Sequence, residues 1–559
     1  QSDYKLSYEL HFLFVENGFL ISRMSYDHPR IKSLFEHAKT SLEKAQLCFL
    51  LSSQQMLGNS GQSIEKGLQG LRYCNVDVAN AEQIDAVLVE AEFRTLDSLM
   101  AGNSWGEHVQ VSSGGSISEE VSLAYRLCAQ LSGAAQISGR RDLLFYVVYK
   151  GMQVALRHGV NEHALVIYAM YSMLLAKQGN YAEAKKVADS VLKLVERYPQ
   201  CADLPYIYLA TGTFLWHFIH PLQDAIDFQL KAHEIGYEYG DITRGVVAGY
   251  SNSVINRYAQ GFSLLKLDGC LKTLEALSQK HKMVHLAGRY YQRLVTMLSQ
   301  SGENDLLNDS SFPAAEWQVI QSCVLKPFIG HLRIQWFFWS EQDELAWQQV
   351  NDARAEIYQM AGFVTPQEQR FIAALLACRR LSQADTNTRK FLTATIRISL
   401  DELKVLSTFC AGNVEHKYLL LQAEQGAYQQ QTIDKLAPLY ESAIESAAAN
   451  GFLQYQALAN ELYGAFLLAK GRHRFALPFL HDAINCYRRW GCRVKVEKLS
   501  ERYQDLLKQQ KSVATQTHSS TLMPTVSQVS SQSSLHSNQY GLDLSSVMKS
   551  AQAISSELE

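Results

Sequence analysis

The feature that most constrains this chain is a helical-hairpin pattern that returns along its length. The clearest example runs from Leu165 to Pro199. Apolar residues repeat at helical spacing up to Gly179, which suits a tight turn, and a second helical pattern opens at Tyr181. Ala184 stands where the two helices would cross, and a small residue there lets them approach closely. The stretch therefore predicts two antiparallel helices that end at the proline.

A second unit, from Ala457 to Trp490, repeats the arrangement. Small residues fall at its eighth, fifteenth, twentieth and twenty-seventh positions: Gly464, Gly471, Ala476 and Ala483. Tetratricopeptide hairpins need a small side chain or a turn glycine at those positions. Weaker units occur at 58–71, around Ala225 and Ala232, around Ala346 and Ala353, and at 440–443. Helical pairs with a period of about 34 residues form solenoids. We therefore predict an all-α, tetratricopeptide-like helical-hairpin superhelix over residues 1–510.

Composition agrees with such a fold and narrows the partners. Of 559 residues, 47% are hydrophobic, and the net charge of −3 gives no field that would hold nucleic acid or an anionic membrane. The ten cysteines are scattered singly, without a CxxC pair, which indicates reduced, buried thiols in the cytoplasm. We expect protein partners. Because the sequence opens at Gln1 without a signal peptide, we also expect a piece of a longer protein.

One uncharged stretch, from Leu204 to Gln223, has about the length of a membrane-spanning helix. Pro205, Gly212, two threonines and two histidines interrupt it, and it falls within the repeat pattern. These features favour a buried solenoid helix, with a membrane span as the alternative.

The composition changes after Gln510. Residues 511–540 are rich in Ser and Gln and lack periodic apolar content, which predicts a flexible linker. Residues 541–559 then begin a new amphipathic pattern, with Leu542, Val547, Ala551, Ile554 and Leu558 near one helical face. This pattern predicts the start of a helix that leads into a following domain.

A search for catalytic patterns finds no phosphate-binding loop, no dinucleotide-binding turn, no kinase signature and no HExxH zinc motif. His281 and His285 stand four apart on a predicted helix, and His217 and His220 stand beside a helix end. Neither pair has carboxylates or cysteines at metal-ligand spacing, so a solvated face and backbone packing are favoured over a metal site.

Two further motifs have competing interpretations. The run from Ser41 to Lys44 matches the SxxK pattern of an acyl-enzyme nucleophile, but a helix-capping serine is favoured. The aromatic run from Trp336 to Trp339 suits packing against a neighbouring repeat, or else a partner-facing surface. We predict no catalytic, cofactor-binding or metal-binding residues in this chain.

Several stretches resemble the helical-repeat region of bacterial multidomain sensor kinases: 156–198, 220–241, 416–428 and 450–503. In that family a serine/threonine-kinase-like domain and an AAA/STAND-type ATPase precede the repeats, and a GAF sensor and usually a histidine kinase follow them. The resemblance implies that 541–559 enters a GAF-like domain and that ATP binds only in other domains of the parent protein. It also implies a regulatory role, in which the repeats couple the ATPase switch to the output through protein or intramolecular contacts.

Two other functions remain open at the level of sequence. The chain could be the ligand- or protein-sensing repeat domain of a STAND-type transcriptional regulator, in which case a helix-turn-helix would follow it. It could also be an enzyme whose site is assembled from scattered residues, because dispersed sites escape a motif search.

Overall fold

A computed structural model of the chain describes residues 2–20, 28–54, 60–100, 117–281, 286–300, 307–321, 325–360 and 362–506. All regular structure in these ranges is helical, so the predicted all-α class is confirmed. The chain divides into two compact units, Gln1–Gln504 and Asp505–Glu559. The predicted linker at 511–540 and the predicted helix at 541–559 lie outside the described residues.

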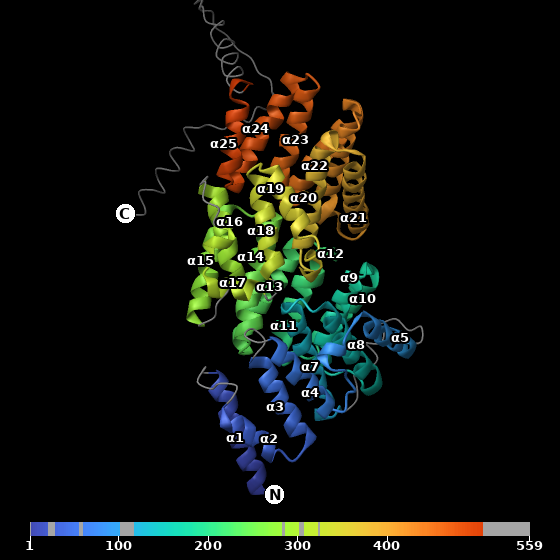
Figure 1. Cartoon of the computed structure of the whole chain (residues 1–559), viewed down its shortest axis with the longest axis vertical. Helices are drawn as coiled ribbons and strands as arrows, with labels where there is room; N and C mark the ends of the chain where they lie inside the picture. The colour runs from blue at the N-terminus through green and yellow to red at the C-terminus, as the bar shows by residue number, and fades with distance from the viewer. Residues whose placement is uncertain are drawn as a thin grey trace, which may run out of the picture. The chain divides into compact units, whose positions relative to one another are not determined.

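Most helices of the first unit form pairs that are joined by short turns and packed against the next pair (Figure 1). The N-terminal elements are α1 (Ser2–Leu20), α2 (Pro29–His37), α3 (Ser41–Gln54), α4 (Ser60–Tyr73), η1 (Ala81–Gln83), α5 (Ala86–Met100), α7 (Glu119–Ile137), α8 (Arg141–His158), α9 (Ala164–Lys177) and α10 (Tyr181–Val195). The central elements are α11 (Leu204–Thr211), η2 (Gly212–Trp216), α12 (His217–Ile219), α13 (Leu222–Glu238), η3 (Ile242–Ala248), α14 (Gly249–Gln260), α15 (Leu264–Lys280), α16 (Leu286–Gln300), η4 (Asp309–Ser311), α17 (Ala314–Gln321), α18 (Leu325–Trp339), α19 (Asp343–Asp352) and η5 (Ile357–Met360). The last elements are α20 (Thr365–Arg380), η6 (Leu381–Gln383), α21 (Thr386–Tyr428), α22 (Ile433–Ala449), α23 (Leu453–Ala469), α24 (His473–Trp490) and α25 (Arg493–Arg502).

Both well-registered hairpins are present as predicted. Helices α9 and α10 are joined at Gly179, whose φ of 82° is the left-handed conformation that glycine adopts without strain. The predicted crossing residue, Ala184, is fully buried. In the α23–α24 hairpin Gly464 is needed for close approach, because a Cβ added there would lie 2.7 Å from Leu480 Cδ2. The small residues therefore set the distance between paired helices.

The uncharged stretch from Leu204 is not one helix. It forms α11, the π-helical turn η2 and the short α12, and the chain breaks at His220 before α13 begins. Gly212 opens the π-helical turn where a Cβ would lie 2.8 Å from the Ala225 carbonyl oxygen of α13. The residues of α11 and η2 are all buried by protein, as the solenoid interpretation requires. Among the described residues, no helix is both long enough and apolar enough to cross a membrane.

Helix α21 is a departure from a regular hairpin array. It spans 43 residues but contains a non-helical residue, Cys410, with φ −145° and ψ 82°. It is therefore two helices that meet at a kink. The second of them lies against both α20, through Lys417 and Glu368, and α22, through Glu424 and Tyr440.

The kink in α21 coincides with contacts between segments far apart in the sequence. The buried Asn413 side chain donates to the carbonyl oxygens of His217 (2.8 Å) and His220 (2.7 Å) and accepts from the amide of Leu222 (2.9 Å). On α23, Gln454 donates to the carbonyl oxygen of Ala259 at 2.7 Å. These partners are 191 to 196 residues apart.

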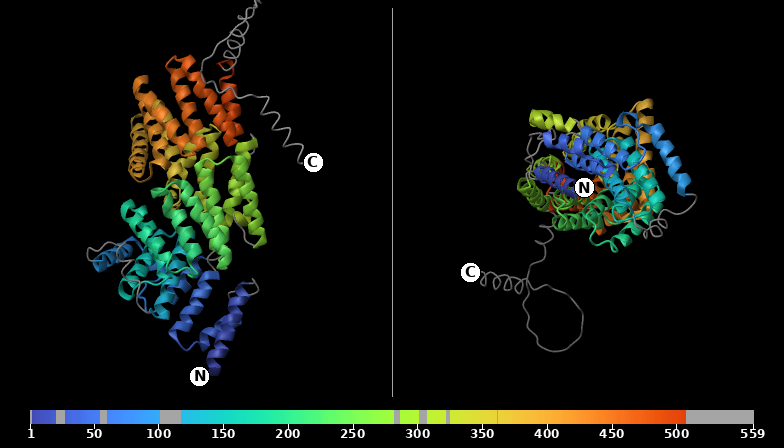
Figure 2. Two further views of the ribbon diagram at one scale, coloured as in Figure 1. Left: turned by 180° about the vertical axis from the view of Figure 1, so that it is seen from behind. Right: turned by 90° about the horizontal axis from the view of Figure 1, so that it is seen from below.

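A simple solenoid has contacts only between neighbouring repeats. Here helices from the middle of the chain also lie against helices from its end, as both side views in Figures 1 and 2 show for the green and orange segments. The inner helices therefore enclose a common core.

Candidate functional site

The aromatic run at the end of α18 reaches this common core. Trp336, Phe338 and Trp339 are buried, and Phe337 is partly buried. The Trp339 ring lies 5.0 Å from that of Trp490 on α24 and 6.3 Å from that of Tyr455 on α23, measured between centroids. Packing of the run, which the sequence favours, is confirmed, but its partners come from the far end of the sequence and not from the adjacent hairpin.

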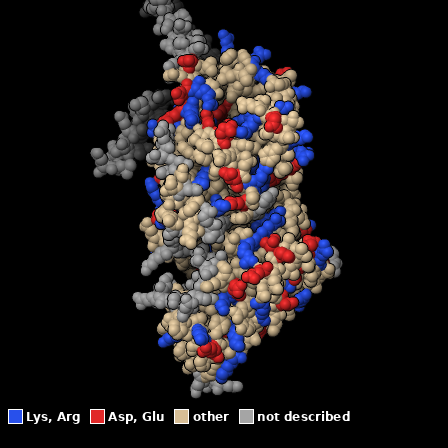
Figure 3. All heavy atoms as spheres, viewed as in Figure 1, with Lys and Arg blue, Asp and Glu red and all other residues tan. Residues whose placement is uncertain are grey.

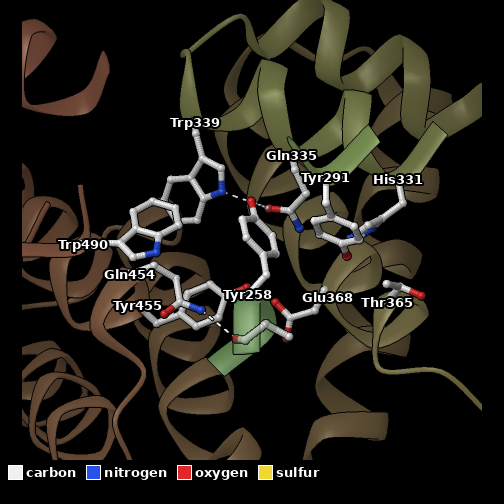
Figure 4. A pocket seen from close by; sticks show the side chains of 11 residues that line it. Tyr258, Tyr291, His331, Gln335, Trp339, Thr365, Glu368, Gln454, Tyr455 and Trp490 are labelled. Carbon is white, nitrogen blue, oxygen red and sulfur yellow. Dashed lines mark hydrogen bonds between the residues drawn. The ribbon is translucent and has the colours of Figure 1, made fainter. Parts of the chain in front are cut away.

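A small cavity lies beside Trp339 (Figure 4). We name the residues around it the axial cluster: Tyr258, Ala259, Tyr291, His331, Gln335, Trp339, Thr365, Glu368, Gln454, Tyr455 and Trp490. They come from α14, α16, α18, α20, α23 and α24, so the cluster exists only when these helices meet. The space open to the centre of a water molecule is about 10 Å³, which suits a single water and excludes a metabolite in this conformation.

The charged member of the axial cluster is fully paired. Glu368 of α20 accepts from the Lys417 ammonium through Oε1 and from the Tyr455 hydroxyl through Oε2. All three side chains are buried. Burial, followed by the charge of Glu368, raises the pKa of Tyr455 well above its usual range. Because both carboxylate oxygens are occupied, Glu368 is not placed to act as an acid or a base on a substrate.

A second buried ion pair repeats this design one hairpin further on. Glu461 of α23 accepts from the Tyr487 hydroxyl and from the Lys495 ammonium, each at 2.7 Å. Lys495 also donates to Glu341 at 2.7 Å, and Arg502 pairs with the same carboxylate. Burial alone would raise the pKa of Glu341, but the two cations outweigh it and lower the pKa. The turn after α18 is thus tied to α25 by charge.

Three buried histidines lie along the same interior. His217, His331 and His416 are at most 4% exposed. Burial lowers the pKa of His217 and of His331 to about 3. It also lowers the pKa of His416 well below 6.5, with a further contribution from Lys417. All three are therefore neutral in the folded protein at physiological pH.

Several polar atoms around the cavity have no protein hydrogen-bond partner among the described residues: His331 Nδ1, Thr365 Oγ1, Gln454 Oε1 and Trp490 Nε1. Donors and acceptors both occur in this set, and a bridging water can satisfy such groups where the space allows it. The cavity can therefore hold a water molecule. Among the side chains that line it, no nucleophile lies next to a free general base.

The sequence-predicted candidates lie elsewhere. His281 directly follows Lys280, the last residue of α15, and its predicted partner His285 lies outside the described residues. The His217 ring is buried, and the His220 ring stacks on that of Trp216 at 4.1 Å. Packing next to a helix end, as favoured from the sequence, is what the structure shows. In the described part of the chain, no three His, Cys, Asp or Glu side chains are grouped as metal ligands would be.

The SxxK run also has a structural role, with one correction. Ser41 is exposed in the first turn of α3, and the capping residue is Thr40. The Thr40 hydroxyl accepts from the Glu43 amide at 3.1 Å, and the Glu43 carboxylate accepts from the Thr40 amide at 3.0 Å. This reciprocal pair is a capping box.

Charged side chains of the described residues are mixed in sign on one face of the molecule. On the face drawn in Figure 3, basic and acidic side chains are interspersed among neutral ones. This distribution agrees with the small net charge.

Comparison with known proteins gives no further guide. No family's sequence model matches the chain, and no curated protein is significantly similar to it. The function must therefore be argued from the residues and their arrangement.

Proposed function

We propose that this chain is a non-catalytic, regulatory repeat segment of a multidomain signal-transducing protein, a sensor histidine kinase, and that it acts through protein or intramolecular contacts. One observation carries the proposal: paired helices stack around an interior that is filled by side chains. The cavity beside the axial cluster suits a single water. A surface of stacked helices, by contrast, suits contact with other protein domains.

The finer fold belongs to the same proposal. We assign the helical pairs to a tetratricopeptide-like superhelix, supported by the small residues at the hairpin crossings and the left-handed glycines at the turns. The kinked α21 and the contacts across 191 to 196 residues would close this superhelix more tightly than an open array.

In this proposal the repeats couple an upstream ATPase switch to downstream sensor and output domains in the cytoplasm. The resemblance of 416–428 and 450–503 to sensor-kinase repeats supports this role. ATP would bind in domains outside this chain. The buried, free thiols among the described cysteines are compatible with a reducing compartment.

The flanking reading frame tests the proposal. We expect ATPase motifs upstream, and GAF and histidine-kinase motifs downstream. A helix-turn-helix downstream would instead support the transcriptional regulator, and the absence of ATPase motifs would exclude both.

A second experiment tests the non-catalytic part. The purified chain is heated with and without Mg-ATP, Zn²⁺ or Mn²⁺, and its unfolding temperature is measured. We expect no shift. A concentration-dependent rise with one of these probes would point to a binding site within the chain and refute this part of the proposal.

A further inference from the structure

Helix α1 carries an exposed apolar stripe on its outer side. We define the α1 stripe as Leu6 (60% exposed), Leu10 (59%) and Leu13 (49%). Their spacing of four and three residues is that of the seam of a two-stranded coiled coil. The opposite side of the helix is buried against α2 and α3, where the Tyr8 hydroxyl donates to the carbonyl oxygen of Glu43 at 3.2 Å. The α1 stripe therefore faces away from the core of its own chain.

The part of α21 before its kink carries a second exposed stripe. We define the α21 stripe as Phe391 (37% exposed), Ile398 (57%) and Val405 (48%), which recur every seven residues. Other apolar residues of this segment, such as Leu392 and Leu403, are buried. The α21 stripe is thus the outward side of a helix whose inner side is already packed.

A row of cations runs along one edge of the α21 stripe. Each apolar residue of the stripe directly follows one of them: Lys390, Arg397 and Lys404. All three are exposed, and none is paired with a carboxylate among the described residues. The carboxylate of Glu402, on the same helix, is bound by Arg370 instead. The edge therefore keeps its positive charge available to a partner.

The α1 stripe has an acidic edge with the same interval. Glu9 and Glu16 are seven residues apart, and both lie on one side of the stripe. The ion-pair partner of Glu9 among the described residues is the exposed Lys5, at 3.9 Å. This long and exposed pair leaves the carboxylate of Glu9 open to a second cation.

The positions of the two edges decide how the helices would pair. Glu9 directly precedes Leu10 of its stripe, and Arg397 directly precedes Ile398 of the other. Seen from the N-terminus of each helix, both edges therefore lie on the same side of their stripes. Two facing helices bring such edges together only when they run antiparallel.

One antiparallel register matches the stripes and the edges together. Its apolar pairs are Leu6–Ile398, Leu10–Ala394 and Leu13–Phe391, and its ionic pairs are Glu9–Arg397 and Glu16–Lys390. A shift by one heptad would place Leu10 opposite the carboxylate of Asp401, so it is disfavoured.

Within one chain the two stripes do not cover each other, since both are exposed and α1 and α21 lie far apart (Figures 1 and 2). The occupant with matching chemistry is α1 of a second copy. We propose that two copies of this chain associate reciprocally, with α1 of each packed antiparallel on the α21 stripe of the other. Reciprocal pairing gives twofold symmetry and doubles an interface that is small at each contact, so the dimer is weak. The inference does not depend on the proposed kinase function, since it rests on the two stripes.

Sedimentation equilibrium of the 559-residue chain at several protein concentrations tests for this dimer. We expect reversible dimerisation that weakens in high salt, because the edges are ionic and exposed. Glu9→Arg alone and Arg397→Glu alone should each weaken dimerisation by about tenfold or more, since each replaces attraction by repulsion at both contacts. Arg474→Glu, at an exposed position of α24, is the matched control and should leave dimerisation unchanged.

Mixing the two variants separates a lost contact from a failure to fold. In a mixed dimer the arginine introduced at position 9 faces the glutamate introduced at position 397, and the other contact keeps its native charges. We therefore expect the mixture to dimerise as strongly as the parent chain.

Four results would overturn the proposal. They are a parent chain that stays monomeric at every concentration, a dimer that neither variant weakens, a mixture that does not recover, and a monomer that binds anionic lipid vesicles through Arg397. The last result would assign the α21 stripe to a membrane surface. All four are distinct from the test of the proposed function, which depends on motifs in the flanking reading frame.

Discussion

Mild acid should destabilise this protein through its three buried histidines. In the folded chain the pKa of His217 and of His331 is about 3, and that of His416 is also far below 6.5. In the unfolded chain a histidine has a pKa of about 6.5. At pH 5 the unfolded histidines are protonated and the folded ones are not, so unfolding takes up protons and acid favours it.

The size of the effect follows from these pKa differences. Since pH 5 lies about 1.5 units below the unfolded pKa and each unit is worth about 1.36 kcal/mol, His217 and His331 cost about 2 kcal/mol each. These two histidines together should lower the free energy of unfolding by about 4 kcal/mol between pH 7.5 and 5, and His416 adds a loss in the same direction. The stabilisation is complete above pH 6.5 and is lost as the pH falls toward 3.

Burial, followed by the charge of Lys185, also lowers the pKa of His220, so this histidine acts in the same direction and pH range. Three carboxylates act in the opposite direction or at lower pH. Burial raises the pKa of Glu424, so its protonation favours the folded state in acid and offsets part of the loss. The lowered pKa values of Asp203 and Glu341 contribute mainly below pH 5, because their unfolded pKa values lie near 4. The interval from pH 6.5 to 5 therefore isolates the histidines.

The assay is guanidinium unfolding followed by circular dichroism and tryptophan fluorescence at several pH values. His416→Phe keeps a planar ring between Phe452 and Tyr455, and it should reduce the pH dependence of the free energy of unfolding. His473→Phe is the matched control, because His473 is exposed. The reasoning is refuted if His416→Phe and the parent protein lose the same stability between pH 7.5 and 5.

Three further predictions concern packing and buried charge. Lys417→Met leaves Glu368 buried without its cation and should lower the free energy of unfolding by about 3–5 kcal/mol, measured in denaturant. The double variant with Glu368→Gln should recover much of that loss. Equal costs for the single and double variants would contradict this prediction. Gly464→Ala should destabilise the protein by about 1–3 kcal/mol, because the added Cβ would contact Leu480. Gly269→Ala has open space around it and should stabilise the protein by about 0.5–1 kcal/mol. Thermal unfolding of both variants checks the two signs. Asn413→Ala should cost about 2–4 kcal/mol, since it leaves the Leu222 amide and two carbonyl groups without their partner. Hydrogen exchange should then speed up at the α12–α13 junction, and unchanged exchange there would argue against the bridging role.

The local fold could be predicted from the sequence because its signals are local. Each signal concerns a single hairpin: the helical periodicity, the turn glycines Gly179 and Gly471, and the small residue Ala184 at a helix crossing. Both hairpins that these signals predict are present. Helix caps were predicted less well: Thr40 rather than Ser41 caps α3, because neighbouring hydroxyl residues compete for the same role.

The axial cluster could not be predicted because it depends on contacts across the whole chain. Its residues come from six helices, and no sequence period links Tyr258 to Trp490 or Ala259 to Gln454. One signal was available. Glu368 stands next to a long apolar run, and a carboxylate in such a place needs a buried partner. Its partner, Lys417, is 49 residues away, and the sequence around Lys417 does not indicate that this lysine is buried.

The bridges made by Asn413 and Gln454 have a consequence for synthesis on the ribosome. The carbonyl group of Ala259 leaves the ribosome 195 residues before the side chain that will bond to it. Because translation proceeds at about 5–20 residues per second, the inner apolar surfaces of the middle helices stay uncovered for roughly 10–40 s. During that time the nascent chain exposes apolar surface that is buried in the finished protein, and such surface makes a folding chain prone to aggregate.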